Sequence, residues 1–227
     1  LHLYYGKKAE GCMDYLLTYY DRGFSGNPYD AGTDRTYSMD SLPQELSCYG
    51  NGDFRSASLM LENGDGSMSC DMRYKNYTIR DGKYSLPGLP AVYADNEEAQ
   101  TLEIVLEDPA TGVEAMLLYG VLPELDIITR SVYVRNQSSE KIYVNKVMSA
   151  ELDFLYGDYD LLTFYGRHAM ERNLQRVPVA HGSQMIGSVR GTSSHQYNPM
   201  MILAEKDTTE DHGGCYAMSF VYSGNFQ

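Results

Sequence analysis

The feature of this sequence that most limits its fold is a period of two in its hydrophobic residues. The longest run covers residues 142–154, where Ile142 and Leu152 fall on one face of an extended chain and Asp153 falls on the other. A strand holding this pattern would have about twice the usual length, and Lys146 breaks the alternation. The pattern therefore predicts a long strand with a bend or bulge near Lys146.

Shorter runs with the same period lie at residues 70–75, 102–106, 113–121 and 216–222. Turn-forming residues separate them at 63–66, 81–82, 108–109, 136–139 and 212–214. Only one segment has helical spacing, at Met13, Leu16, Leu17 and Tyr20. Because no strand–helix–strand rhythm follows, we predict an all-β fold of antiparallel sheets, a β-sandwich with one short helix.

Two long segments lack this alternation, at residues 23–52 and 177–199. Both are rich in glycine and other residues typical of turns. Long irregular loops in compact domains are usually functional or disordered, so we expect the functional residues in these two segments.

Charge and cysteine usage exclude several classes of function. Eighteen basic and 31 acidic residues give a net charge of −13, which disfavours nucleic acid as a partner. The longest apolar run, at about residues 115–122, is too short to span a membrane. The four cysteines and five histidines have no metal-binding spacing, so we expect no metal and no cofactor. Scattered cysteines favour a reducing cytoplasm.

No nucleophile, phosphate-loop or zinc-protease motif is present, so a single acidic residue is the best candidate for a site. Asp53 lies between Gly52 and Phe54, at the end of the first long loop. It could accept hydrogen bonds from sugar hydroxyls, with the glycines allowing close approach of the backbone. It could equally be a turn aspartate that binds its own backbone, and the residues alone favour that interpretation.

Eight segments, read in order, resemble the amino-terminal domain of glycoside hydrolase family 36, the family of bacterial α-galactosidases. They are residues 2–8, 37–45, 50–55, 86–93, 102–106, 126–132, 190–199 and 221–226. The resemblance implies one domain over residues 1–227, a β-supersandwich of the galactose mutarotase-like type. It also implies a (β/α)8 catalytic barrel downstream, whose aspartates cleave terminal α-galactosyl residues with retention. This chain has no Lys-x-Asp motif like that of the family's nucleophile, so we expect a non-catalytic fragment of a longer enzyme.

The resemblance also assigns residues. Asp53 is implied to reach the galactose pocket, and no residue of this chain is expected to be catalytic. Residues implied to face the barrel or a neighbouring subunit are Tyr37, Asp40, Arg55, Ser194, His195, Gln196 and Asn198. The implied partners are an α-galactoside substrate, the chain's own barrel, and further copies in a homo-oligomer, a tetramer as in bacterial relatives. The alternatives are a free-standing carbohydrate-binding module and a purely structural oligomerisation domain.

Overall fold

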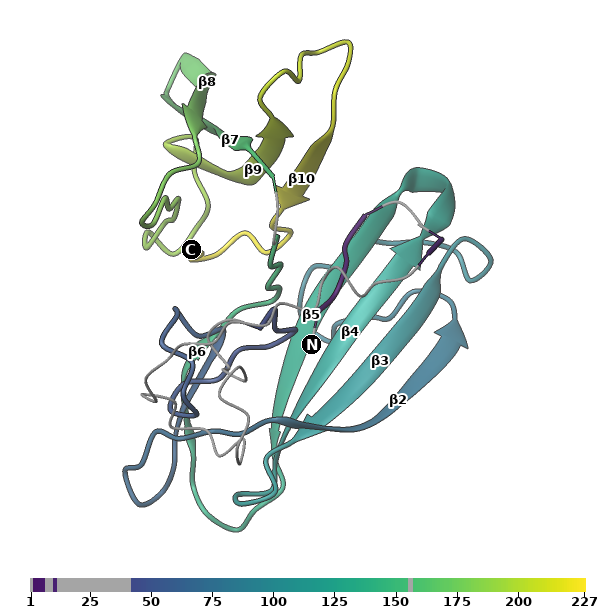
Figure 1. The fold of residues 1–227 in the computed structure, drawn as a ribbon, viewed down its shortest axis with the longest axis vertical. Helices are drawn as coiled ribbons and strands as arrows, with labels where there is room; N and C mark the ends of the chain where they lie inside the picture. Colours follow the sequence, from purple (N-terminus) through teal and green to yellow (C-terminus); the bar gives the residue numbers. More distant parts are fainter. Residues whose placement is uncertain (1, 7–9, 12–41, 155–156) are drawn as a thin grey trace. The chain divides into compact units, whose positions relative to one another are not determined.

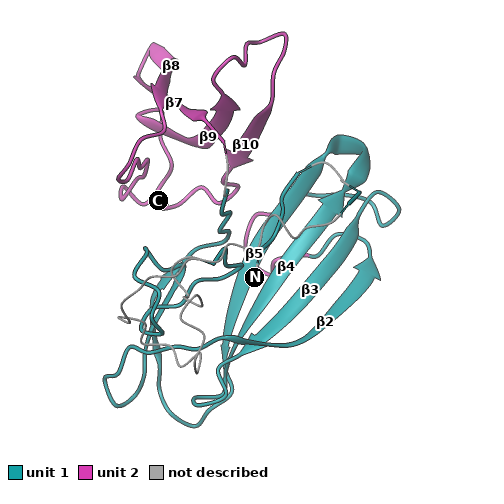
Figure 2. Ribbon diagram, in the orientation of Figure 1, with its two compact units in different colours: residues 1–84, 93–155 teal, residues 85–92, 156–227 magenta. Residues whose placement is uncertain are grey.

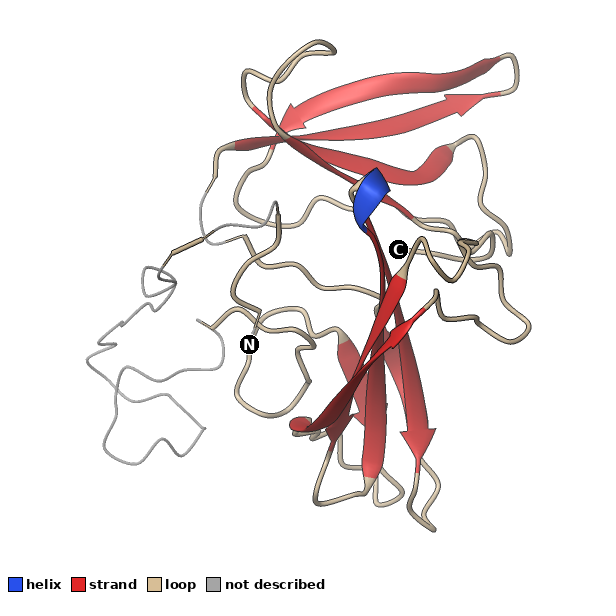
Figure 3. Ribbon diagram, turned by 90° about the vertical axis from the view of Figure 1, so that its right-hand side faces the viewer, coloured by secondary structure: helices blue, strands red, loops and turns tan. Residues whose placement is uncertain are grey.

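The computed structural model describes residues 2–6, 10–11, 42–154 and 157–227, and these form an all-β chain of antiparallel sheets (Figure 1). The all-β prediction is confirmed. The helix predicted from Met13 to Tyr20 lies outside the described residues. Within the described residues, Figure 3 shows a short helical turn, the 3-10 helix η3 (Pro123–Leu125).

The chain divides into two compact units, coloured separately in Figure 2. The first comprises Leu1–Tyr84 and Tyr93–Leu155, and the second comprises Ser85–Val92 and Tyr156–Gln227. Each unit is described by itself below. That residues 1–227 form one domain stays a prediction.

The first unit contains a four-stranded sheet and a two-stranded sheet. The larger has the order β2 (Arg73–Asp81), β3 (Gln100–Glu107), β4 (Val113–Leu122) and β5 (Ile127–Asn136). The smaller pairs β1 (Leu59–Glu62) with β6 (Tyr143–Val147). The predicted turn at 81–82 begins at the last residue of β2, and the predicted turn at 108–109 follows β3. At the second turn, Asp108 N donates to Val113 O at 2.8 Å and closes the β3–β4 hairpin.

The hydrophobic core lies on one face of β4. Alternate residues of β4 face inward, and a register row joins Ile104, Leu117 and Val132 across three strands. Buried members of this core are Leu46, Cys48, Leu59, Leu61, Cys70, Val113, Ala115 and Leu117. The core therefore joins β1 and the segment before it to the larger sheet, in the manner of a sandwich.

The long strand predicted over residues 142–154 is wrong in its length, because β6 ends at Val147. The predicted irregularity near Lys146 is confirmed: Met60 pairs with Lys146 and Leu61 with Val144, so one residue of β6 is left out of the register. No strand is assigned to residues 148–154, and Glu151 and Asp153 accept hydrogen bonds from the backbone of the segment before β1.

The second unit contains one sheet with the order β10 (Cys215–Ser219), β9 (Tyr197–Glu205), β7 (Tyr159–Arg167) and β8 (Met170–Pro178). The run predicted at residues 216–222 is thus a strand only as far as Ser219. The second predicted loop is confirmed between β8 and β9. The aspartate Asp160 accepts hydrogen bonds from Arg176 Nε at 2.6 Å and Lys206 Nζ at 2.9 Å, which links β7 to β8 and to the turn after β9.

Candidate functional site

The loop that carries Asp53 is fixed at both of its ends. An isolated bridge joins Cys48 to Leu59, the first residue of β1. Beside it, the backbone N–H of Ser58 donates to Ser47 O at 3.1 Å. Because both ends of the loop are held by backbone pairing, Asp53 occupies a defined position in the first unit.

Glycine is required where this loop begins. Gly50 has φ +89°, and a Cβ built there would lie 2.8 Å from the Cα of Ser69. Gly52 follows with φ +94°. Both values are strained for residues with a side chain. The close approach that Gly50 permits is to another segment of this chain.

Four hydrogen bonds end on the Asp53 carboxylate. Its Oδ1 accepts from the Arg55 backbone N at 2.9 Å and from Arg55 Nε at 3.0 Å. Its Oδ2 accepts from Arg55 Nη2 at 2.9 Å and from Gln44 Nε2 at 2.6 Å. The Asp53 side chain is 1% exposed, whereas that of Arg55 is 36% exposed. The hydrogen bonds to Asp53 raise the pKa of the Arg55 guanidinium above its ordinary value.

A second aspartate supports this arrangement. Asp153 Oδ2 accepts from the Gln44 backbone N at 2.9 Å and from Arg55 Nη1 at 3.3 Å. Two residues earlier, Glu151 Oε2 accepts from the Ser47 backbone N at 2.7 Å. The segment after β6 thus supplies carboxylates to the backbone that precedes the Asp53 loop.

Sequence reasoning missed Gln44 and Asp153 as members of this site. A signal existed for each: Gln44 lies within the family-like segment 37–45, and Asp153 lies on the polar face of the run over residues 142–154. Neither signal indicated that the Gln44 backbone N–H binds the Asp153 carboxylate, because 109 residues separate them.

A second polar cluster surrounds Glu45, the neighbour of Gln44. Its Oε2 is hydrogen-bonded to His2 Nδ1 at 2.9 Å, and its Oε1 accepts from the Tyr119 hydroxyl and lies 3.6 Å from Arg130 Nη2. The Arg130 guanidinium lies over the Tyr119 ring, 4.3 Å from its centroid. Burial opposes ionisation of Glu45, but the bonds from His2 and Tyr119 and the charge of Arg130 outweigh it and lower the pKa of Glu45.

The other predicted site residues divide into two groups. Tyr37 and Asp40 lie outside the described residues. Four lie in the second unit: Ser194, His195, Gln196 and Asn198. Ser194 bridges to Tyr197, so the two residues between them form a tight exposed turn at the start of β9. The structure thus brings Asp53 together with Arg55 but leaves the other four in a separate unit.

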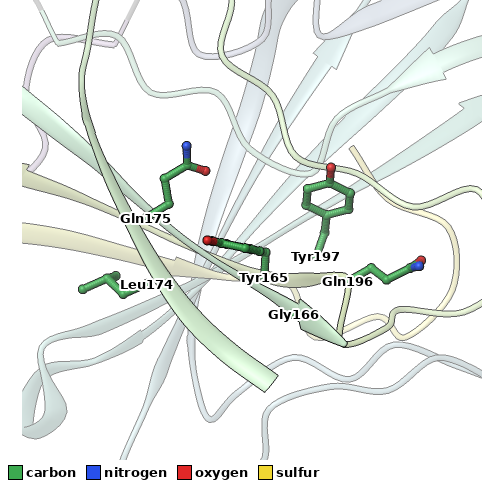
Figure 4. Close-up of a pocket in the computed structure, with 6 residues that line it drawn as sticks. All are labelled: Tyr165, Gly166, Leu174, Gln175, Gln196 and Tyr197. Atoms are coloured by element: carbon green, nitrogen blue, oxygen red, sulfur yellow. The ribbon is translucent and has the colours of Figure 1, made fainter. Parts of the chain in front are cut away.

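A pocket of about 640 Å³ adjoins this turn (Figure 4). It is lined by Tyr165, Gly166, Leu174, Gln175, Gln196 and Tyr197. Figure 4 shows Tyr165 between Gln175 and Tyr197, with Gln196 extending away from Tyr165. Arg190 Nη1 donates to Gln196 Oε1 at 2.9 Å and holds this amide. Since no carboxylate lines the pocket, it lacks the acid pair that glycoside hydrolysis requires.

Within the described part of the chain, no three His, Cys, Asp or Glu side chains gather in a way that could hold a metal ion. The same residues include no helix with the length and apolar composition needed to cross a bilayer.

The Glycosyl hydrolase family 36 N-terminal domain matches residues 1–227. The chain belongs to this family. It is 61% identical over 226 residues to the bifunctional alpha-galactosidase/sucrose kinase AgaSK of Mediterraneibacter gnavus, covering all of this chain and 24% of that protein. It is 42% identical to the alpha-galactosidase Mel36A of Lactobacillus acidophilus, covering 99% of this chain and 31% of that protein.

Solved structures of family 36 proteins have the same fold as this chain. The galactosidase domain of AgaSK superimposes with a TM-score of 0.94, over 99% of this chain and 31% of that one. A raffinose complex of the alpha-galactosidase AgaA from Geobacillus stearothermophilus gives a TM-score of 0.93 at 41% identity, with the same coverage. The chain therefore spans 24–31% of the length of these relatives.

Proposed function

We propose that this chain is the non-catalytic amino-terminal part of a retaining α-galactosidase and that Asp53 binds hydroxyl groups of the galactosyl residue. The observation that carries the proposal is a buried, rigidly held Asp53 carboxylate in a family 36 domain. Relatives are named alpha-galactosidases, and one was solved with raffinose. The contribution of Asp53 is to orient the sugar, which lowers the barrier by positioning.

The bond-breaking carboxylates of this proposed enzyme belong to the downstream barrel. A retaining glycosidase needs two carboxyl groups about 5–5.5 Å apart on either side of the anomeric carbon. Asp53 and Asp153 both form ion pairs with Arg55, so the negative charge of each is balanced by a group of the protein itself. Such paired carboxylates suit binding and support better than acid–base chemistry.

The remaining predicted site residues are assigned to assembly. Under this proposal, the segments around Tyr37, Asp40, Ser194, His195, Gln196 and Asn198, together with Arg55, face the barrel or a neighbouring subunit. The oligomer proposed is a homotetramer. The tight turn at the start of β9 supports the assignment, because it presents two exposed polar side chains on a fixed backbone.

The proposed location is the cytoplasm. Cys48, Cys70 and Cys215 are free thiols, and the first two lie buried in the core of the first unit. Unpaired cysteines in a core are typical of proteins that fold in a reducing compartment.

The test is Asp53→Ala in the full-length protein, assayed with an aryl α-galactoside. We expect kcat/KM to fall about 10- to 100-fold, because charge-assisted hydrogen bonds to the sugar contribute roughly 1.5–3 kcal/mol each. An unchanged value would favour the purely structural alternative. Galactose binding by the 227-residue chain alone, measured by calorimetry, would favour the carbohydrate-binding module.

Asp71→Ala is the matched control. Asp71 pairs with Arg73 two residues later, at 2.7 Å from Nη2, as Asp53 pairs with Arg55. Its side chain is 35% exposed, against 1% for Asp53, so its removal should leave kcat/KM within about twofold of the parent value.

A further inference from the structure

The Asp53 carboxylate has no vacant acceptor position. An ionised carboxylate offers about four lone-pair sites, two on each oxygen. The four donors from Arg55 and Gln44 fill two on Oδ1 and two on Oδ2. A sugar hydroxyl can therefore donate to Asp53 only after one of these donors leaves.

The donors differ in how readily they can leave. The Arg55 backbone N–H is part of the fixed loop. Gln44 is buried, and its backbone N is held by Asp153 at 2.9 Å. The Arg55 side chain is about one-third exposed and, within the described residues, also donates to Asp153 Oδ2 at 3.3 Å and to Leu42 O at 2.8 Å. Its guanidinium is thus the donor that can move away without losing every partner.

Removal of the guanidinium would free a specific pair of acceptor sites. Nε occupies one site on Oδ1, and Nη2 occupies one site on Oδ2. These are two nearly parallel donors directed at the two oxygens of one carboxylate. Two hydroxyls on adjacent carbons of a sugar ring present the same arrangement.

We propose that Arg55 is a displaceable occupant of the Asp53 carboxylate, exchanged for two adjacent hydroxyls of a hexose while Asp153 and Leu42 O retain the guanidinium. The inference rests on the proposed function of Asp53 and deepens it. Arg55 keeps the buried carboxylate paired when no sugar is present. A sugar lacking either hydroxyl leaves a buried acceptor unpaired and binds more weakly.

This exchange has a thermodynamic signature. Because the Arg55 guanidinium competes with the sugar for Asp53, the apparent affinity for the sugar is the intrinsic affinity multiplied by the fraction of molecules in which the carboxylate is available. Removing Arg55 therefore strengthens galactose binding, whereas a structural clamp would weaken binding when lost. Removing the charge of Asp153 has the opposite effect, because Arg55 then has a poorer alternative to Asp53.

The experiment uses the full-length protein, an aryl α-galactoside as substrate and galactose as inhibitor. For Arg55→Met we expect KM and the galactose Ki to fall about threefold or more, with kcat within about twofold. For Asp153→Asn, which keeps an oxygen to accept from the Gln44 backbone, we expect both constants to rise about threefold or more. In the double variant the effect of Asp153→Asn should vanish, because there is no guanidinium left to retain.

If Arg55→Met does not fold, KM and the galactose Ki are measured for Arg55→Lys instead. A lysine keeps the charge but offers a single point donor, so both constants should lie between those of the parent and those expected for Arg55→Met. Arg73→Met is the control, because Arg73 makes the same kind of pairing with Asp71, a partly exposed aspartate. It should change neither constant.

Failure of this inference is distinguishable from failure of the proposed function. If Asp53→Ala lowers kcat/KM but Arg55→Met raises KM and Ki, Arg55 is a fixed clamp and the exchange is wrong. If Asp53→Ala has no effect, Asp53 does not bind the sugar and both ideas fail. Persistence of the Asp153→Asn effect in the Arg55→Met background would also overturn the exchange.

Discussion

Two partly buried carboxylates of the first unit, Glu45 and Asp153, take their donors from residues that lie far from them in the sequence. Glu45 binds Tyr119 of β4 and lies beside Arg130 of β5, and Asp153 binds the Gln44 backbone. Buried charges are tolerated only when they are paired in this way. At the scale of single residues, these pairs attach the segment before β1 to the rest of the first unit.

Glu45 makes the stability of this chain depend on pH. Its pKa in the folded protein is below the ordinary value of 4.5, so its contribution is complete above that value and is lost as pH falls through the lowered pKa. We expect Glu45→Gln to reduce the free energy of unfolding by about 1–3 kcal/mol at neutral pH. The deficit should shrink in acid below about pH 4. Urea unfolding across this range measures it.

The control for this prediction is Glu124→Gln, since Glu124 is exposed on η3. It should change the free energy of unfolding by less than about 0.5 kcal/mol at any pH tested. A deficit for Glu45→Gln that stays constant from neutral pH into acid would contradict the assigned role of the Glu45 charge.

At the scale of elements, the segment after β6 shows how an alternating pattern can serve a purpose other than a strand. Residues 151 and 153 keep the period of two, and both carboxylates bind the segment before β1. Glu151 accepts from the backbone N–H of Ser47, and Asp153 accepts from that of Gln44. Side-chain acceptors thus satisfy backbone N–H groups where no strand is assigned.

The glycine that opens the Asp53 loop provides a test at this scale. We expect Gly50→Ala to destabilise the chain by about 2–4 kcal/mol, because positive φ is strained and the new Cβ would press on the Ser69 backbone. Gly66→Ala is the matched control, with φ +83° and nothing within 4 Å of its Cβ. It should cost about 1–2 kcal/mol. Equal losses in thermal unfolding would show that the contact with Ser69 is unimportant.

At the scale of the whole molecule, the chain presents two compact units and a candidate binding carboxylate in only the first. The pocket of the second unit is lined by uncharged side chains. Neither feature supplies the paired acid and nucleophile of a glycosidase. The proposed division of labour follows: binding support in this chain and bond cleavage elsewhere in the polypeptide.

Enzyme assays of the 227-residue chain test that division. We expect no hydrolysis of an aryl α-galactoside by the purified chain, at concentrations where the full-length protein gives a strong signal. Circular dichroism should show a β-rich spectrum, so that absence of activity reflects absent catalytic groups. Turnover by the pure chain that is abolished in Asp53→Ala would place catalysis here and refute the proposal.

The sequence by itself determined the all-β class, the turns between strands and the irregularity near Lys146, because alternation and turn chemistry are local properties of the chain. Its eight family-like segments also identified the family and drew attention to Asp53. The length of β6 was not predictable, since the same alternation continues through residues 148–154, where no strand is assigned.

Only the tertiary structure decided what Asp53 contacts. Local sequence suggested a turn aspartate that binds its own backbone, and the bond from the Arg55 backbone N–H, two residues later, agrees with that interpretation. The bond from Gln44 spans nine residues, and the bonds by which Asp153 holds Arg55 and Gln44 span 98 and 109 residues. Hydrogen bonds across such separations arise from the packing of the whole unit, and no local pattern encodes them.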